Sequence, residues 1–302
     1  MTIGTGARHS VGYIPEVTYN TTPSTPAFQL LRHTGFTGGM SKNTFESAEL
    51  GGRQIKQFRH GNKSVGFDVP FELSYTTFDV LLEALMGGTW TTNVLKAGDT
   101  RRSFTMERLF GNLDTPEYWR YTGAEFDKLT LSVKPDAIVT GTFSVVAKDQ
   151  SIGTAILTGA TYVAETTTLP LDAFTGTINE GGATIGVITG LEMSLVNGLS
   201  PMFVLGSDTT IRPGIGKSRV TGTVTAYFES KTLLEKFINE TASSFDFTLT
   251  DGTSSIKFDM PNIKYTGGTP DVDGEGEVTV NLPFTALYDA TDASQLVITR
   301  TP

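Results

Sequence analysis

The chain has no cysteine among its 302 residues. Disulfide bonds, thiolate metal sites and cysteine nucleophiles are therefore excluded. A chain without cysteine fits a reducing or an oxidising compartment equally well. No apolar run approaches the roughly 18 residues that a membrane-spanning helix needs. The N-terminal segment MTIGTGARHS also lacks the apolar core of a secretory signal. We therefore expect a soluble protein that is not exported by a standard signal peptide.

Positive charge is scarce as well: 23 Lys and Arg stand against 32 Asp and Glu, for a net charge of −9. Proteins that bind DNA or RNA usually present a positive field to the phosphates, so ordinary nucleic-acid binding is disfavoured. Long windows of Ala, Leu, Glu and Lys are missing, whereas the chain holds 33 Gly, 19 Phe and much threonine. This composition predicts a mainly β protein with packed cores and exposed, hydroxyl-rich strands.

Residues 63–88 combine a strand pattern with a helix pattern. Strict alternation predicts a strand with one buried face, made of Val65, Phe67, Val69, Phe71 and Leu73. The spacing then changes to i, i+3, i+4, i+7, which predicts a short helix with a buried stripe of Phe78, Leu81, Leu82 and Leu85. Thr76 or Thr77 is the expected N-cap, and Gly87 is the expected stop.

The same strand–helix pattern returns at residues 218–240. The alternating residues are Val220, Val224, Ala226 and Phe228, Ser230 is the expected cap, and the helical stripe is Leu233, Leu234, Phe237 and Ile238. Other segments recur in the same order: TGFTGGMSKN from Thr34 matches TGLEMSLVNG from Thr189, YTGA from Tyr121 matches YTGG from Tyr265, and VTGTFSVVAKD from Val139 matches VTVNLPFTALYD from Val278. We interpret this as an internal duplication of one β-rich domain with one helix per copy.

The duplication suggests five segments. They are an N-terminal arm (1–33), a first domain (34–150), a connector (151–183), a second domain (184–290) and a C-terminal arm (291–302). The first arm is rich in proline and threonine, so we expect it to become ordered against its own body or against a neighbouring subunit.

Several motifs suggest a chemical function, and each has a simpler reading. The segment RPGIGKS (212–218) resembles a phosphate loop, but Ile211 stands where that motif needs glycine, so we expect a plain loop. The segment DVDGEGE (271–277) resembles a calcium loop with misplaced glycines. We expect solvated carboxylates there, and a metal site stays open. His9, His33 and His60 are distant in sequence and are expected to be surface or packing residues.

No motif for catalysis stands out. A G-x-S-x-G sequence is missing, and a glycosidase-type pair of distant carboxylates stays open without any pair being singled out. Ion pairs with an acidic neighbour are the favoured role for a mild basic cluster, with a nucleic-acid patch as the alternative; the cluster is Arg101, Arg102, Arg108 and Arg120. We expect no enzyme activity, no cofactor, and no catalytic, cofactor-binding or metal-binding residue.

Four features together resemble a known family. They are the arm GARHSVGYIPEVTYNTTPSTPA, the stretch SAELGGRQ, the segment GNKSVGFDVPFELSYTTFDVLLEALMGGTW, and the repetition in the second half. The chain resembles the major tail tube proteins of long-tailed, non-contractile bacteriophages, in particular the group with two tandem tube domains. The resemblance covers nearly the whole chain and is one of organisation. It implies two β-sandwich or barrel-like domains, each with one short α-helix, and extended N- and C-terminal arms.

The resemblance also implies a function. The protein would be a structural virion protein that self-assembles into stacked rings, forming the hollow tail tube through which DNA passes during ejection. A duplicated chain implies a homotrimeric, pseudo-hexameric ring. The implied partners are further copies of the chain and the tail terminator, tape measure and distal tail proteins, with no membrane. The implied location is the virion tail, after synthesis in the cytoplasm of the host bacterium.

An acidic lining of such a tube would repel the phosphates of DNA and let the duplex slide without binding. The candidate lumen-facing residues are Asp68, Glu72, Asp271, Asp273, Glu275 and Glu277.

Two other classes of protein stay open. Another virion component, such as a tail terminator, a decoration protein or a receptor-binding protein, would not polymerise along an axis. A β-sandwich carbohydrate-active protein is the less favoured class, because no acid pair stands out.

Overall fold

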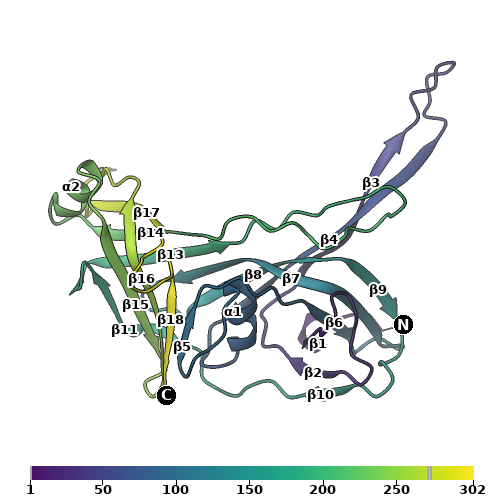
Figure 1. The fold of residues 1–302 in the computed structure, drawn as a ribbon, viewed down its shortest axis with the longest axis horizontal. Helices are drawn as coiled ribbons and strands as arrows, with labels where there is room; N and C mark the ends of the chain where they lie inside the picture. The colour runs from purple at the N-terminus through teal and green to yellow at the C-terminus, as the bar shows by residue number, and fades with distance from the viewer. Residues whose placement is uncertain (1, 271, 273) are drawn as a thin grey trace.

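Two β-rich units lie side by side, and a long hairpin projects from one of them (Figure 1). The computed structural model describes residues 2–270, 272 and 274–302, apart from the side chains of 173–175. The helices in this part of the chain are α1 (Asp79–Met86), α2 (Thr232–Ile238) and one 3₁₀ turn, η1 (Gly6–Arg8). The mainly β fold with two short α-helices agrees with the expectation from sequence.

The strands up to the middle of the chain are β1 (His9–Pro15), β2 (Ala27–Leu30), β3 (Thr37–Glu46), β4 (Phe58–Glu72), β5 (Val94–Lys96), β6 (Phe104–Phe110), β7 (Glu117–Val133), β8 (Thr140–Ala147) and β9 (Asp149–Gly153). Those that follow are β10 (Thr161–Val163), β11 (Asp172–Glu180), β12 (Ala183–Thr184), β13 (Ile188–Val196), β14 (Arg219–Tyr227), β15 (Ser243–Thr250), β16 (Ser255–Tyr265), β17 (Thr279–Ala286) and β18 (Val297–Thr301).

One large antiparallel sheet runs through both halves in the order β3-β4-β8-β7-β13-β14-β17-β16. Its last four strands repeat the arrangement of its first four, and the halves join where β7 pairs with β13. The register repeats too. Met40 lies opposite Val65 in the first half, and Leu195 lies opposite Val220 in the second. This is the spacing at which the sequence segments TGFTGGMSKN and TGLEMSLVNG match.

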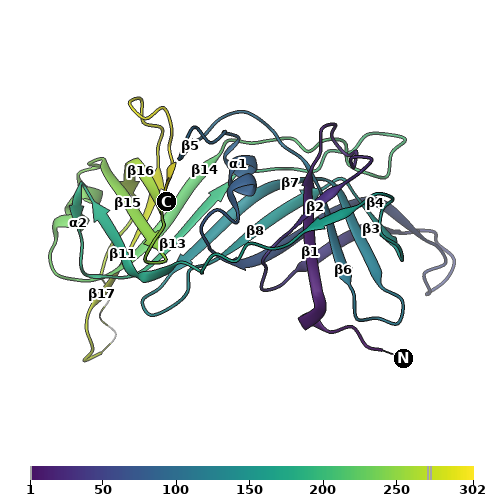
Figure 2. The same cartoon turned by 90° about the horizontal axis from the view of Figure 1, so that it is seen from below.

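A second set of strands packs across each half. The set is β10-β2-β1-β6-β7-β9 in the first half, and β11-β15-β16-β18 in the second, where β5 of the first half adds to β18. The long strand β7 belongs to both layers, because its first part pairs with β6 and its last part with β8 and β13. Figure 2 shows α1 beside the place where the two halves meet.

The segments expected to be arms contain strands of the body. In the N-terminal segment, β1 pairs with β6 from His9 opposite Phe110 to Pro15 opposite Phe104. In the C-terminal segment, β18 pairs with both β16 and β5. In the second half, β11 and β18 occupy the positions that β1 and β9 occupy in the first half. The domain limits stay a proposal, and this pairing favours wider units that include these four strands.

The core confirms the predicted alternation in the first strand–helix segment. Val65, Phe67, Val69, Phe71 and Leu73 are all buried. In the second segment Val220, Val224 and Ala226 are buried as predicted, but Phe228 is exposed. The aromatic side chains of the first half gather in one cluster, in which Phe143 lies 4.6 Å from Phe71 between ring centroids. These contacts place the centre of the first core between β4, β8 and α1.

The helix caps agree only in part. Gly87 ends α1 with a left-handed φ of 65°, as predicted. The N-cap of α1 is Phe78, so the expectation of Thr76 or Thr77 is wrong. The Thr77 hydroxyl instead hydrogen bonds to the hydroxyls of Ser74 and Thr166, both at 2.6 Å. The Thr77 side chain therefore bonds to the turn before α1 and to the segment after β10 instead of capping the helix.

One sequence match is also wrong. Tyr265 lies opposite Phe284, and Phe126 holds the same place opposite Val145. The counterpart of Tyr265 is therefore Phe126, and the match between its YTGG segment and the YTGA segment at Tyr121 is a coincidence of letters.

We expect the Phe143→Ala variant to lose about 3–5 kcal/mol of unfolding free energy, because Phe143 is fully buried among aromatic rings. Urea denaturation of the unassembled chain measures this loss. The matched control is Phe58→Ala, at an exposed position of the projecting hairpin, which we expect to change stability little in the unassembled chain. Equal losses for the two variants would contradict the assignment of the core.

Candidate functional site: a polar sheet face and two open edges

The large sheet has one face against the core and one open face that is rich in hydroxyl groups. A hollow of about 790 Å³ lies on the open face and spans the junction of β7 with β13. The hydroxyl side chains along it include Thr130, Ser132, Thr140, Thr142, Ser194, Thr221, Thr223 and Thr285. Since side chains alternate along each strand, these residues share one face with the polar members of the alternating patterns.

Two predicted residues lie on this polar face. Cross-strand pairing links Glu72 through Thr140 and Ser132 to Glu192 in the second half. It likewise links Asp68 through Ser144 to Lys128. The same pairing places Arg219 beside Val196, the partner of Lys128, and Lys264 beside Thr285. The face therefore carries three carboxylates and three cations from both halves.

Sequence reasoning did not single out Glu192 or Lys128. The signal was present for Glu192, because ITGLEMSLV alternates and puts Glu192 on the same side as Ser194. Glu275 and Glu277 lie elsewhere, exposed in the loop between β16 and β17. Asp271 and Asp273 lie outside the described residues.

The sheet ends in two edges. At one end, β3 pairs with β4 and has no strand on its other side among the described residues. At the other end, β16 pairs with β17 only over Ile263–Tyr265. The counterpart of β16 in the first half is β7. There the strand continues past Phe126, the counterpart of Tyr265, and residues 128–133 pair with β13. Open strand edges favour pairing with another chain.

The junction between the halves is well built. Six residue pairs join β7 to β13, from Val133 opposite Leu191 to Lys128 opposite Val196. The loop 197–218 then crosses onto the first half. Its Asn197 side chain donates to the Leu85 carbonyl at 2.8 Å. Its Arg212 donates to the buried Glu125 at 2.7 Å.

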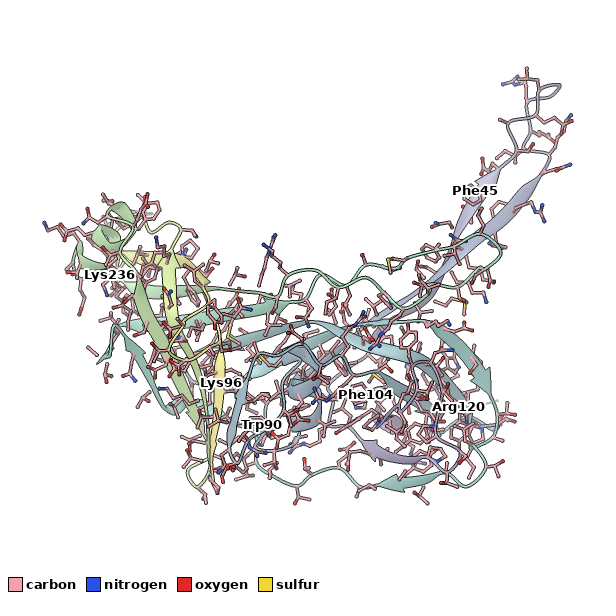
Figure 3. The ribbon with its side chains drawn as sticks, in the orientation of Figure 1. Phe45, Trp90, Lys96, Phe104, Arg120 and Lys236 are labelled. Atoms are coloured by element: carbon pink, nitrogen blue, oxygen red, sulfur yellow. The ribbon has the colours of Figure 1, made fainter. Side chains whose placement is uncertain are left out.

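Three buried glutamates each have a cation partner. Arg120 donates to Glu107 at 2.6 Å; Figure 3 labels Arg120. Arg101 joins Arg212 at Glu125. Lys236 of α2 contacts Glu180 at 2.5 Å, and burial together with Glu180 raises the pKa of Tyr265. Removing one partner of such a pair would leave an uncompensated buried charge. We therefore assign these ion pairs a structural role.

The predicted arginine cluster therefore separates into different roles. Arg101 and Arg120 form the expected ion pairs. Arg102 donates to the Glu83 carbonyl at 3.1 Å, and Arg108 lies over the ring of Phe36, 4.1 Å from its centroid. The four side chains do not act as one phosphate-binding patch.

Two histidines that are distant in sequence meet beside Arg108. Arg108 Nε donates to His9 Nε2 at 3.0 Å, so His9 Nδ1 carries the proton and donates to His33 Nε2 at 2.8 Å. His33 Nδ1 in turn donates to the Leu31 carbonyl at 2.9 Å. Burial, Arg108 and His33 lower the pKa of His9 to about 4. This pairing ties β1 to the segment after β2.

We expect folding stability to fall as pH decreases from 6.5 towards 4. The unfolded chain binds a proton on His9 near pH 6.5, whereas the folded chain resists protonation down to about pH 4. The stabilisation from neutral His9 is therefore complete above pH 6.5 and is lost progressively between pH 6.5 and about 4. Thermal unfolding across this range should show a smaller pH dependence in His9→Asn than in wild type. His60→Asn, at an exposed histidine, is the control; equal slopes for His9→Asn and wild type would refute the assignment.

Other expected sites can be located. Residues 212–218 lie in the loop before β14, as the simpler reading predicted. Among the described residues no three His, Asp or Glu side chains gather to hold a metal ion, and the calcium-like segment includes the two undescribed aspartates. No helix in the described part of the chain combines the length and apolar character that a membrane crossing requires.

A duplicated β-sandwich with open sheet edges and paired internal charges defines a structural subunit suited to self-assembly. Comparison with protein families agrees: a family model described as phage tail tube protein matches residues 6–286. The chain therefore belongs to the phage tail tube protein family and is a structural component of the virion tail. Membership implies self-assembly into a tube, association with other tail proteins and a role that is not enzymatic. No curated protein matches the chain.

Proposed function

We propose that copies of this chain close into a ring by repeating, between chains, the junction that joins the two halves within one chain. The observation that carries the proposal is the repeated strand order, which ends in β3 on one side and β16 on the other. Leu195 and Leu129 face each other at the internal junction. Counting along the chain from the matched positions Val65 and Val220, and Phe126 and Tyr265, gives Met40 and Gly268 as their counterparts. The segment after Tyr265 would therefore pair with β3 of the next copy.

This closure satisfies both open edges at once. A head-to-tail contact of this kind makes a closed ring when its rotation matches the symmetry. The internal junction and the external junction would alternate, so three chains supply six similar units. A homotrimeric, pseudo-hexameric ring follows, and stacked rings form the tube.

The open polar face is proposed to line the channel through which DNA passes during ejection. Hydroxyl groups there carry no charge that attracts phosphates, and the carboxylates of Asp68, Glu72 and Glu192 balance the cations of Lys128, Arg219 and Lys264. A lining that neutralised phosphates would bind DNA and release counterions, which would slow its passage. Glu275 and Glu277, with Asp271 and Asp273, are proposed to add negative charge near the junction between chains.

Within this proposal, the tape measure protein would occupy the channel before ejection, and the tail terminator and distal tail proteins would contact the two ends of the tube. Assembly would take place in the cytoplasm of the host bacterium, without a membrane partner.

Cysteine cross-linking tests the ring contact, because the wild-type chain has no cysteine. Ser41 and Gly267 are the counterparts of Val196 and Lys128, which face each other. We expect Ser41→Cys/Gly267→Cys to give covalent dimers and trimers on mild oxidation, visible on denaturing gels. Thr130→Cys/Ser194→Cys, at an opposed pair within the chain, should cross-link without any increase in mass.

Each single variant should give at most dimers. Rings seen by electron microscopy without a Ser41–Gly267 ladder would overturn the proposed contact. Rings that never stack would favour the tail terminator alternative over the tube.

Charge reversal tests the channel. We expect tubes of Asp68→Lys/Glu192→Lys to retain DNA at low ionic strength and to release it as salt rises, because exposed lysines neutralise phosphates. Filter binding of assembled tubes measures this retention. The matched control is Asp99→Lys/Glu165→Lys, at exposed positions off the polar face. The proposal fails if the two double variants bind DNA equally.

A further inference from the structure

The two helices occupy equivalent places but differ in how they are covered. In α1, Leu81, Leu82, Leu85 and Met86 are buried. In α2, none of the residues is buried, and the predicted stripe is open at its end: Phe237 is 36% exposed and Ile238 is 64% exposed. Aligning the LLE triplets makes Phe237 the counterpart of Leu85 and Ile238 the counterpart of Met86. The second helix therefore lacks a cover that the first helix has.

Part of the cover on α1 comes from the other half of the chain. The loop 197–218, which connects β13 to β14, lies against the end of α1. Leu199 and Ile215 line one hollow with Leu85 and Met86. The hydrogen bond from Asn197 to the Leu85 carbonyl fixes this loop at the last turn of the helix.

The counterpart of that loop in the first half is the projecting hairpin, residues 42–62. It consists of the outer ends of β3 and β4 with the turn between them, in the place where the second half has the loop between β13 and β14. Both extend from the large sheet towards the same side of the molecule, but the hairpin passes beyond the body of its own chain (Figure 1). Its apolar side chains are exposed, including Leu50 at 91% and Phe45 at 62%, and Figure 3 labels Phe45 on the projecting arm.

We propose that the projecting hairpin of one copy covers α2 of the next copy in the ring. The inference rests on the proposed ring and extends it. Applying the internal junction between chains places β3 beside the segment after Tyr265, and the hairpin then has the relation to α2 that loop 197–218 has to α1.

The chemistry of the two surfaces fits this contact. Phe45, Leu50 and Ile55 of the hairpin are apolar and exposed, as are Phe237 and Ile238 of α2. Burying such side chains against one another favours association. The net charges are opposite: in residues 42–62 four Lys and Arg stand against Glu46 and Glu49, and in residues 229–240 three Glu stand against Lys231 and Lys236. Opposite charges around an apolar contact favour one orientation.

Site-specific photocross-linking tests the contact in assembled, full-length protein. A benzophenone amino acid replaces Ile238, and the captured peptide is identified by mass spectrometry. We expect it to come from residues 42–62 of a second copy, as shown by mixing isotope-labelled and unlabelled chains. The same probe at Ile215 is the internal control, and it should capture the α1 region of its own chain.

Hydrogen exchange supplies a second measurement. Amides of 232–238 should become protected when rings form, and a variant whose residues 47–57 are replaced by a two-residue turn should form rings with α2 still unprotected. Capture of any other segment by the Ile238 probe would overturn the inference, as would equal protection of α2 in rings with and without the tip. Absence of rings in the wild type would instead count against the proposed function.

Discussion

The central constraint on this fold is that the edge strands of its antiparallel sheet need partners. An unpaired strand presents backbone N–H and C=O groups in a row, and it invites pairing with any other strand. Inside this chain, β7 and β13 remove one such pair of edges, and loop 197–218 reinforces the join with Asn197 and Arg212. The same duplication creates a second pair of edges, β3 and the end of β16, which one chain cannot bring together.

That constraint accounts for features that are otherwise unrelated. The hairpin of β3 and β4 extends past the body, and α2 exposes apolar residues that α1 buries. The open face of the sheet is polar on every strand, although its other face forms the core. In the proposed ring, a tail tube subunit needs these properties together, because it attaches to its neighbours at both edges while its channel face stays inert towards DNA.

The sequence predicts what depends on neighbouring residues. Alternation from Val65 to Leu73 requires only a strand with one dry side, and the left-handed stop at Gly87 requires only a glycine. Distant partners are another matter. Thr77 bonds to Thr166 instead of capping α1, and His9 meets His33 and Arg108 through strand pairing that no local pattern shows. Glu192 was readable from its alternating strand, but its place in a row with Glu72 depends on the junction. The apolar stripe of α2 can be found in the sequence, but its exposure cannot, because exposure depends on contacts from outside the second half of the chain.

A cryo-electron microscopy map of the assembled protein tests the central claim most directly. The account predicts rings of three chains and six similar units, with a continuous sheet in which β3 of each chain lies beside the segment after Tyr265 of the next and the threonine-rich face points to the axis. A map in which β3 has no strand beside it, or in which that face points outward, would contradict the account.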